Sequence, residues 1–155
     1  MKKFAAAILF AATAPAWAQS VQLVTPVTYA AESSVVPKVR EACKLEDRLA
    51  ADVSSGLASV TGSAPGQSVK VSIVDVMGVG GGGWTGPKAI SIRVDLLQGD
   101  KVLRSTHLTR TTTGGAFGGF KGTCSMLERD SAVLGKDVAK WVASDAYSTG
   151  EDAKK

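Results

Sequence analysis

The sequence predicts an α+β fold of four strands and two helices in the order β-α-β-β-β-α. Two segments have apolar residues at helical spacing. Four other segments either alternate apolar and polar residues or are rich in β-branched residues, and glycine-rich stretches separate several of the segments. A strand, helix, strand unit normally places its two strands parallel with a right-handed crossover. We therefore expect a four-stranded mixed sheet with the two helices packed on one face.

The first eighteen residues have the pattern of a cleaved secretory signal. Lys2 and Lys3 precede an apolar run, and a small-residue pattern ends at Ala18. The run is shorter than the about 20 apolar residues that a membrane span needs. We expect cleavage after Ala18, a periplasmic or secreted chain without a membrane span, a single domain over 19–146 and a flexible tail over 147–155.

The charge of the chain argues against a nucleic-acid partner. The sequence has 18 basic and 14 acidic residues, and loss of Lys2 and Lys3 leaves 16 basic residues, so the formal net charge falls from +4 to +2. This excess is too small to predict binding to a polyanion, and export makes nucleic acid a still poorer candidate.

The two cysteines of the chain, Cys43 and Cys124, predict a disulfide. Exported proteins meet an oxidising compartment, and the spacing is not the C-x-x-C of a redox-active pair. In the chain-entropy model, closing so long a loop stabilises the fold by roughly 4 to 5 kcal/mol before strain is subtracted.

The first half of the chain predicts a strand, a helix and a second strand. Residues 21–29 alternate apolar and polar residues and contain Pro26, which predicts an edge strand. A single amphipathic helix is expected over about 35–60, followed by a central strand over 69–77 in which Asp75 is expected to be hydrogen-bonded. The expected buried stripe of the helix comprises Ala42, Leu45, Leu49, Val53, Leu57 and Val60.

The second half predicts a hairpin and a final helix. Residues 89–97 alternate cleanly, Gly99 begins a two-residue turn, and the next strand runs to about Thr113. The register that follows from this turn pairs Leu96 with Leu103, Asp95 with Arg104 and Ile92 with His107. The last helix is expected to be capped by Thr123 or Ser125, with capping-box spacing from Ser125 to Glu128, and to run to about Ala146.

Two glycine-rich segments, 78–88 and 114–124, carry the candidate binding residues. Each combines glycines with aromatic and lysine side chains. Because the first two strands are parallel and the rest follow in hairpins, both segments, both helix N-termini and both cysteines are expected at one end of the sheet. Two interpretations of these segments remain open: the glycines allow two loops to pack closely, or the segments form a binding surface. The candidate binding residues are Trp84, Lys88, Phe117, Phe120 and Lys121.

Nucleotide, metal and catalytic motifs are not supported by the sequence. Gly78-x-Gly80-x-x-Gly83 leads into another strand rather than a helix, and Lys121-Gly122-Thr123 has the wrong order for a phosphate loop. His107 is the one histidine and is expected to pack inside the fold, so we expect no metal, no cofactor and no histidine base.

These features favour a non-enzymatic binding module of the cell envelope whose partner is a protein or a polymer. The aromatic and lysine residues are of the kinds enriched at protein interfaces. A first alternative is capture of a small anionic ligand at the helix N-termini. A second is a lysine-assisted hydrolase in which Lys121 activates Thr123 or Ser125.

The two glycine-rich segments also carry a resemblance. The pairing of Gly-Gly-Gly-Trp84-Thr-Gly-Pro-Lys88 with Gly-Gly-Ala-Phe117-Gly-Gly-Phe120-Lys-Gly-Thr-Cys124 resembles a group of small, exported, uncharacterised bacterial proteins. In element order alone, the chain is similar to the amino-terminal domain of the Tol translocation protein and to the outer-membrane activators of penicillin-binding proteins. That similarity implies a protein-binding envelope module by fold analogy only.

Overall fold

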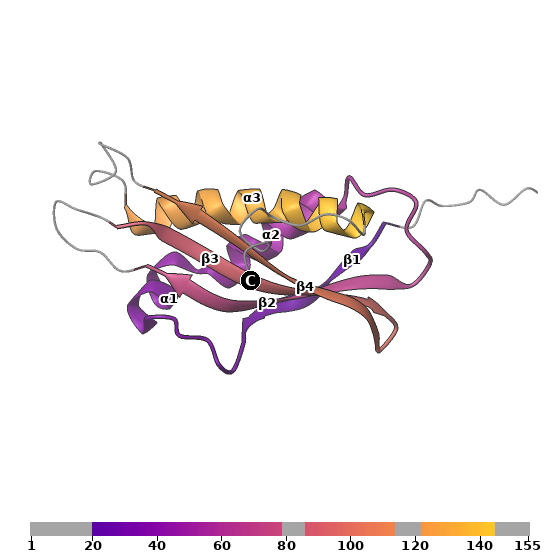
Figure 1. The fold of residues 1–155 in the computed structure, drawn as a ribbon, viewed down its shortest axis with the longest axis horizontal. Helices are drawn as coiled ribbons and strands as arrows, with labels where there is room; N and C mark the ends of the chain where they lie inside the picture. The colour runs from indigo at the N-terminus through magenta and orange to yellow at the C-terminus, as the bar shows by residue number, and fades with distance from the viewer. Residues whose placement is uncertain (1–19, 79–85, 114–121, 145–155) are drawn as a thin grey trace, which may run out of the picture.

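A computed structural model describes residues 20–78, 86–113 and 122–144 of the chain. The predicted α+β class and element order are confirmed, except that the first predicted helix is two helices (Figure 1). The predicted signal (1–18) and tail (147–155) lie outside the described residues. The elements are β1 (Gln22–Tyr29), α1 (Pro37–Cys43), α2 (Leu45–Leu57), β2 (Gln67–Met77), β3 (Lys88–Gln98), β4 (Lys101–Thr112) and α3 (Thr123–Ala143).

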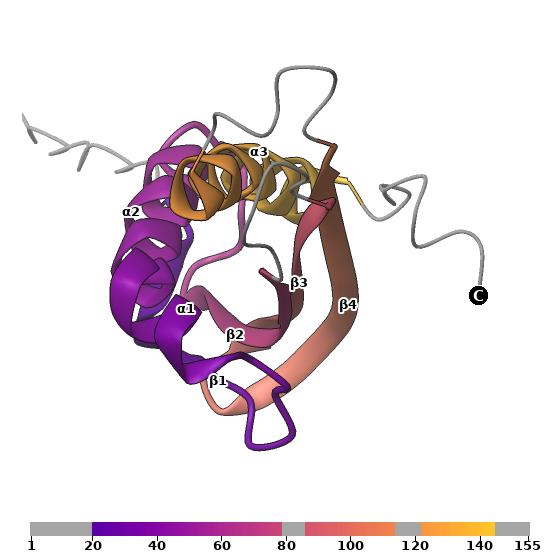
Figure 2. The same ribbon diagram turned by 90° about the vertical axis from the view of Figure 1, so that its left-hand side faces the viewer.

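The four strands form one mixed sheet in the order β1-β2-β3-β4. β1 is parallel to β2, as the crossover rule predicts, and the other two pairs are antiparallel. β1 lies beside β2 at one edge of the sheet. This confirms the edge position predicted from Pro26 and gives the strand order. The helices lie on one face of the sheet (Figures 1 and 2), and we call the opposite face the open face.

The core lies between the sheet and helices α2 and α3. α2 packs against β1 and α3, and α3 packs against β3 and β4. The inward residues of β2 and β3 are almost entirely branched and apolar, which suits two central strands covered by helices. The largest fully buried side chains are Lys88, Leu45, Leu49, Leu57, Ile73, Ile90, Ile92, Leu108, Met126, Leu127, Leu134 and Val53.

The predicted single helix over 35–60 is broken at Lys44. This residue has a left-handed backbone (φ 45°, ψ 50°), which ends α1 and starts α2 in a new direction. The break lets Cys43 reach a disulfide partner while Leu45, two residues later, is fully buried. Ala42, which the sequence placed in the buried stripe, is consequently exposed.

The predicted register between the third and fourth strands is wrong by one residue. The turn pairs Leu97 with Val102 as expected, but a bulge then pairs Leu96 with Arg104. A slip of one residue moves side chains to the other face of a strand. Leu103 and His107 are therefore exposed instead of packed inside.

The same slip changes the partners of two charged residues. Arg104 turns inward, toward α3, and no longer opposes Asp95. Asp95 instead accepts hydrogen bonds from Arg93 Nε (3.1 Å) and Ser105 Oγ on the open face. Asp75, in contrast, behaves as predicted, because Ser34 Oγ donates a 2.6 Å hydrogen bond to its carboxylate.

Helices α2 and α3 touch through two glycines. A Cβ atom at Gly56 would lie 2.3 Å from the carbonyl oxygen of Gly135, and a Cβ at Gly135 would lie 2.4 Å from the carbonyl oxygen of Asp52. Both distances are shorter than any normal contact. Glycine at these positions therefore sets how closely the two helices approach.

Candidate binding pole

The described ends of both glycine-rich segments lie at one end of the molecule (Figure 1). β2 ends there at Met77, β3 begins at Lys88, β4 ends at Thr112 and α3 begins at Thr123. Helix α1 lies at the same end, because a Cβ at Gly78 would come 2.9 Å from a methyl group of Val39. We call this end the disulfide pole.

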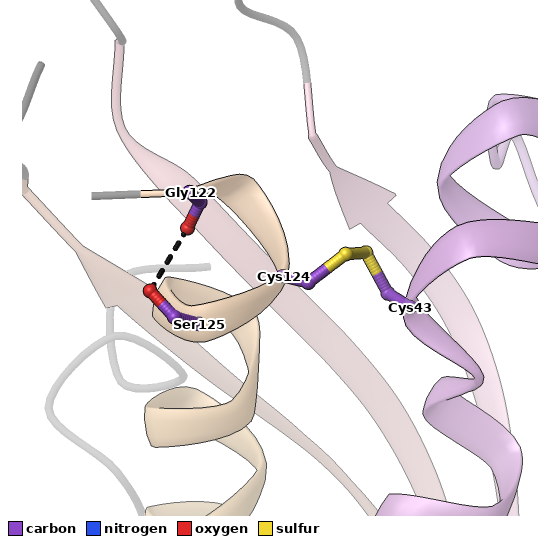
Figure 3. The surroundings of a disulfide bond; sticks show 4 residues. All are labelled: Cys43, Gly122, Cys124 and Ser125. Atoms are coloured by element: carbon purple, nitrogen blue, oxygen red, sulfur yellow. Dashed lines mark hydrogen bonds between the residues drawn. A yellow bond between two sulfur atoms is a disulfide. The ribbon is translucent and has the colours of Figure 1, made fainter. Parts of the chain in front are cut away.

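A disulfide between Cys43 and Cys124 joins α1 to the first turn of α3 at this pole (Figure 3). The two Cα atoms lie 5.1 Å apart, within the normal range for a disulfide. The predicted pairing is therefore confirmed. It holds the N-terminus of α3 beside the end of α1, although the two cysteines are 81 positions apart in the sequence.

The N-terminus of α3 differs from the predicted capping box. Gly122 is the N-cap residue, and no side-chain cap is formed among the described residues. The Ser125 hydroxyl instead donates to the carbonyl oxygen of Gly122 at 3.1 Å (Figure 3). The first backbone N–H groups of α3 are thus left without a hydroxyl cap from Thr123 or Ser125.

Lys88, which the sequence placed on a binding surface, has a fully buried side chain. It lies on the inner face of β3, opposite Thr112 of β4, and its Nζ donates to the carbonyl oxygen of Gly86 at 3.3 Å. A buried ammonium group is stabilised only by hydrogen-bonding or charged neighbours. Lys88 therefore anchors the start of β3 from inside, and direct contact between it and a partner is not supported.

A layer of polar contacts joins the inner face of β4 to α3 and extends away from the pole. Thr112 Oγ1 donates to Asp130, and Arg110 forms an ion pair with Asp137 at 2.5 Å. Both carboxylates are buried. Sequence reasoning missed this layer because the wrong register turned these β4 residues outward. Asp130 and Asp137 recur at seven residues beside Leu127 and Leu134, which is the signal that could have placed them on the buried face.

The same layer continues to the far end of α3. The Arg104 guanidinium donates to the carbonyl oxygens of Trp141 (2.7 Å) and Val142 (2.9 Å). It also lies 4.4 Å from the centre of the Trp141 ring. A cation at the last carbonyls of a helix satisfies acceptors and complements the helix dipole, so Arg104 fixes the C-terminus of α3.

Charged side chains also cover the ring of Tyr29 at the edge of the sheet formed by β1. The Arg40 guanidinium lies 4.2 Å from the centre of the ring and pairs with Glu46 at 3.3 Å. Burial, and next the Glu46 carboxylate, raise the pKa of Tyr29 to about 12, although Arg40 opposes this. A shallow hollow of about 790 Å³ lies beside this group, between β1 and helices α1 and α2.

The four other candidate residues, Trp84, Phe117, Phe120 and Lys121, lie outside the described residues. Within residues 20–78, 86–113 and 122–144, no group of three histidine, cysteine, aspartate or glutamate side chains could hold a metal ion. No helix in the described part of the chain is long and apolar enough to cross a membrane.

No protein-family model and no curated protein sequence matches the chain. Solved structures similar to it include a PelC dodecamer from Paraburkholderia phytofirmans, with 16% identity over 77% of this chain and 86% of that chain and a TM-score of 0.46. A protein from Xanthomonas campestris of the DUF330 family has 16% identity over 84% and 88% of the two chains, with a TM-score of 0.47. A proposed lipoprotein from Caulobacter crescentus has 17% identity over 76% and 93%, with a TM-score of 0.38. These similarities assign no activity to this chain.

Proposed function

We propose that this chain is an exported, non-enzymatic binding module of the bacterial cell envelope that contacts a partner protein or polymer through the disulfide pole. One observation carries the proposal: the ends of β2 and β4 and the starts of β3 and α3 all lie at the pole that the Cys43–Cys124 disulfide closes. The two segments that join these ends carry the same combination of glycine, aromatic and lysine residues.

The residues proposed to contact the partner are Trp84, Phe117, Phe120 and Lys121. Large aromatic side chains supply most of the binding energy at many interfaces, and a neighbouring cation adds specificity. Lys88 is no longer among them, because its side chain is buried. Its role in the proposal is to hold the start of β3 beneath the pole.

The proposal is tested by replacing Trp84, Phe120 and Lys121 together with alanine in the exported protein. Partners would be captured by crosslinking in the intact envelope and identified by mass spectrometry. A matched control replaces Val133 and Lys136, an exposed apolar residue and an exposed cation on α3. We expect the triple variant to lose a crosslinked partner that the control retains. An unchanged set of partners for a folded triple variant would refute the proposal.

A second candidate function is capture of a small anionic ligand at the same pole. The observation that favours it is the glycine N-cap of α3, where backbone N–H groups of the first turn have no side-chain acceptor among the described residues. A thermal-shift screen with phosphate, sulfate and carboxylates would test it. A stabilisation that falls with added salt and is reduced by Lys121→Ala supports this function, and the absence of any stabilising anion counts against it.

A further inference from the structure

A hollow lies at the end of the molecule opposite the disulfide pole, where α3 ends (Figure 1). Its walls come from residues 60–64 after α2, from β3 and β4 beside their common turn, and from the end of α3. It has a volume of about 360 Å³, and we call it the far-end hollow. Val142 and Ala143, the last residues of α3, line it, so the chain leaves the helix at the wall of this hollow.

The far-end hollow has an apolar wall that is partly open to solvent. Leu103 lines it and is 46% exposed, because the bulge after the β3–β4 turn leaves this residue without a partner in the β3 register. Leu96, Val60 and Val142 line the hollow as well. Covering exposed apolar surface with another apolar or aromatic group is favourable, so an occupant with such a side chain is favoured.

The charged side chains that line the far-end hollow and its neighbour are cationic. A second hollow, of about 410 Å³, lies between the end of α2 and α3 and shares three lining residues with the first. Arg104 lines the first hollow, and Lys136 and Lys140 line the second. The described residues that line the two hollows include no aspartate or glutamate. An occupant with a carboxylate is therefore favoured over a basic one.

The chain that leaves α3 carries both kinds of group within reach of the far-end hollow. α3 ends at Ala143, three positions before the end expected from the sequence, and Ser144 is extended (φ −144°, ψ 126°). Asp145, Ala146 and Tyr147 come next in the sequence, outside the described residues. Side chains two residues apart on an extended chain point to the same side. Four extended residues span about 13 Å, so the tyrosine ring can reach the wall that Ala143 itself lines.

We propose that residues 145–147 fold back into the far-end hollow of their own molecule, with the Asp145 carboxylate at the Arg104 guanidinium and the Tyr147 ring over Leu103. A guanidinium has five N–H donors in a planar fork, so one arginine can bind helix carbonyls and a carboxylate together. A tyrosine ring covers a large apolar area and keeps its hydroxyl at a polar rim.

The attachment of this segment to α3 favours it over a separate ligand. Because the chain starts at the wall of the hollow, binding does not incur the full entropy loss of association between two molecules. The hollow is then filled by the chain itself and is closed to other molecules. This contact lies at the opposite end from the disulfide pole and is independent of the binding proposed there.

The first test measures how fast chymotrypsin cuts the folded protein after Tyr147, with mass spectrometry to identify the bond. The protease must take the ring into its own apolar pocket, so a ring bound over Leu103 is protected. Leu103→Asp is expected to raise the cleavage rate about tenfold, the effect of losing roughly half of the burial of a leucine-sized group. The matched control Val133→Asp replaces another exposed apolar residue, outside both hollows, and should leave the rate unchanged. Shielding by α3 alone would be the same in both variants, so equal rates would overturn the proposal.

The second test changes the segment itself, which lies beyond the last helix. Asp145→Asn is expected to raise the cleavage rate about threefold, the effect of losing a charge pair, after correction for a free peptide with the same substitution. Asp152→Asn, beyond the docked residues, is the matched control and should have no effect. If both substitutions change the corrected rate equally, the carboxylate does not hold the segment and the proposal is wrong. A wild-type cleavage rate that falls as protein concentration rises would also overturn it, because the segment would then occupy a second copy.

Discussion

The contact between helices α2 and α3 gives the sharpest quantitative prediction. Replacing Gly135 with alanine places a methyl group 2.4 Å from the carbonyl oxygen and 2.6 Å from the carbonyl carbon of Asp52. Both atoms belong to the backbone of α2, so no side-chain rotation relieves the clash. The helices would have to separate by about 1 Å, and a gap of that size forfeits a quarter to a half of the dispersion energy of the affected contacts.

Two opposing effects decide the magnitude. Alanine is a better helix former than glycine by about 1 kcal/mol. Overpacking a well-packed contact costs about 1 to 3 kcal/mol, and separation also disturbs the partly buried 2.7 Å hydrogen bond from Ser131 to Asp52. We therefore expect Gly135→Ala to lower the free energy of unfolding by about 2 kcal/mol, because the clash with backbone lies at the severe end of this range.

The assay is equilibrium unfolding in urea, compared with a matched control on the exposed side of α2. Ser55→Ala improves helix propensity without new contacts, and we expect a change within about 0.5 kcal/mol. Gly56→Ala, which would meet Gly135 from the other side, should destabilise like Gly135→Ala. If Gly135→Ala were as stable as the wild type or more stable, the close approach of the helices inferred here would be refuted.

Three further predictions concern the disulfide, the polar layer and the β1 edge. Reduction of Cys43–Cys124 should lower the free energy of unfolding by about 4.5 kcal/mol, measured by urea titration with and without reductant; a loss below about 1 kcal/mol would contradict the loop-closure argument. Asp137→Ala leaves the Arg110 charge without its buried carboxylate and should cost about 3 kcal/mol, whereas a stability equal to that of the wild type would show that the pair is dispensable. Because the pKa of Tyr29 is raised from 10 to about 12, the folded state keeps a proton that the unfolded state loses, so stability should fall as pH rises from 10 to 12 and should not do so in Tyr29→Phe. Identical pH profiles for the two proteins would exclude this linkage.

The binding pole was only partly predictable from the sequence. The Cys43–Cys124 pairing followed from the presence of two cysteines in a chain with an export signal, and the common position of the segment ends followed from element order and the parallel crossover. The burial of Lys88 did not follow, because a residue at the end of a strand faces solvent or core depending on what packs above it. A lysine after a glycine-rich segment gives no sign of that packing.

The sequence by itself determined the α+β class, the order of the elements, the edge position of β1 and the disulfide. The first three depend on local periodicity, on turn residues or on a chirality rule, and these act within a segment or between neighbouring segments. The disulfide depends on there being two cysteines in a chain with an export signal. The tertiary structure alone decided the break at Lys44 and the bulge after Leu97.

Both features have the same physical reason. Alternation of side chains along a strand does not by itself determine which face is buried. The buried face of β4 is therefore determined by the groups of α3 that pack against it. Those groups are the Asp130 and Asp137 carboxylates and the carbonyl oxygens of the last helical turn. In the same way, the apolar residues continue at helical spacing through Lys44. The chain turns there because Cys43 must reach Cys124 while the next helix covers the core.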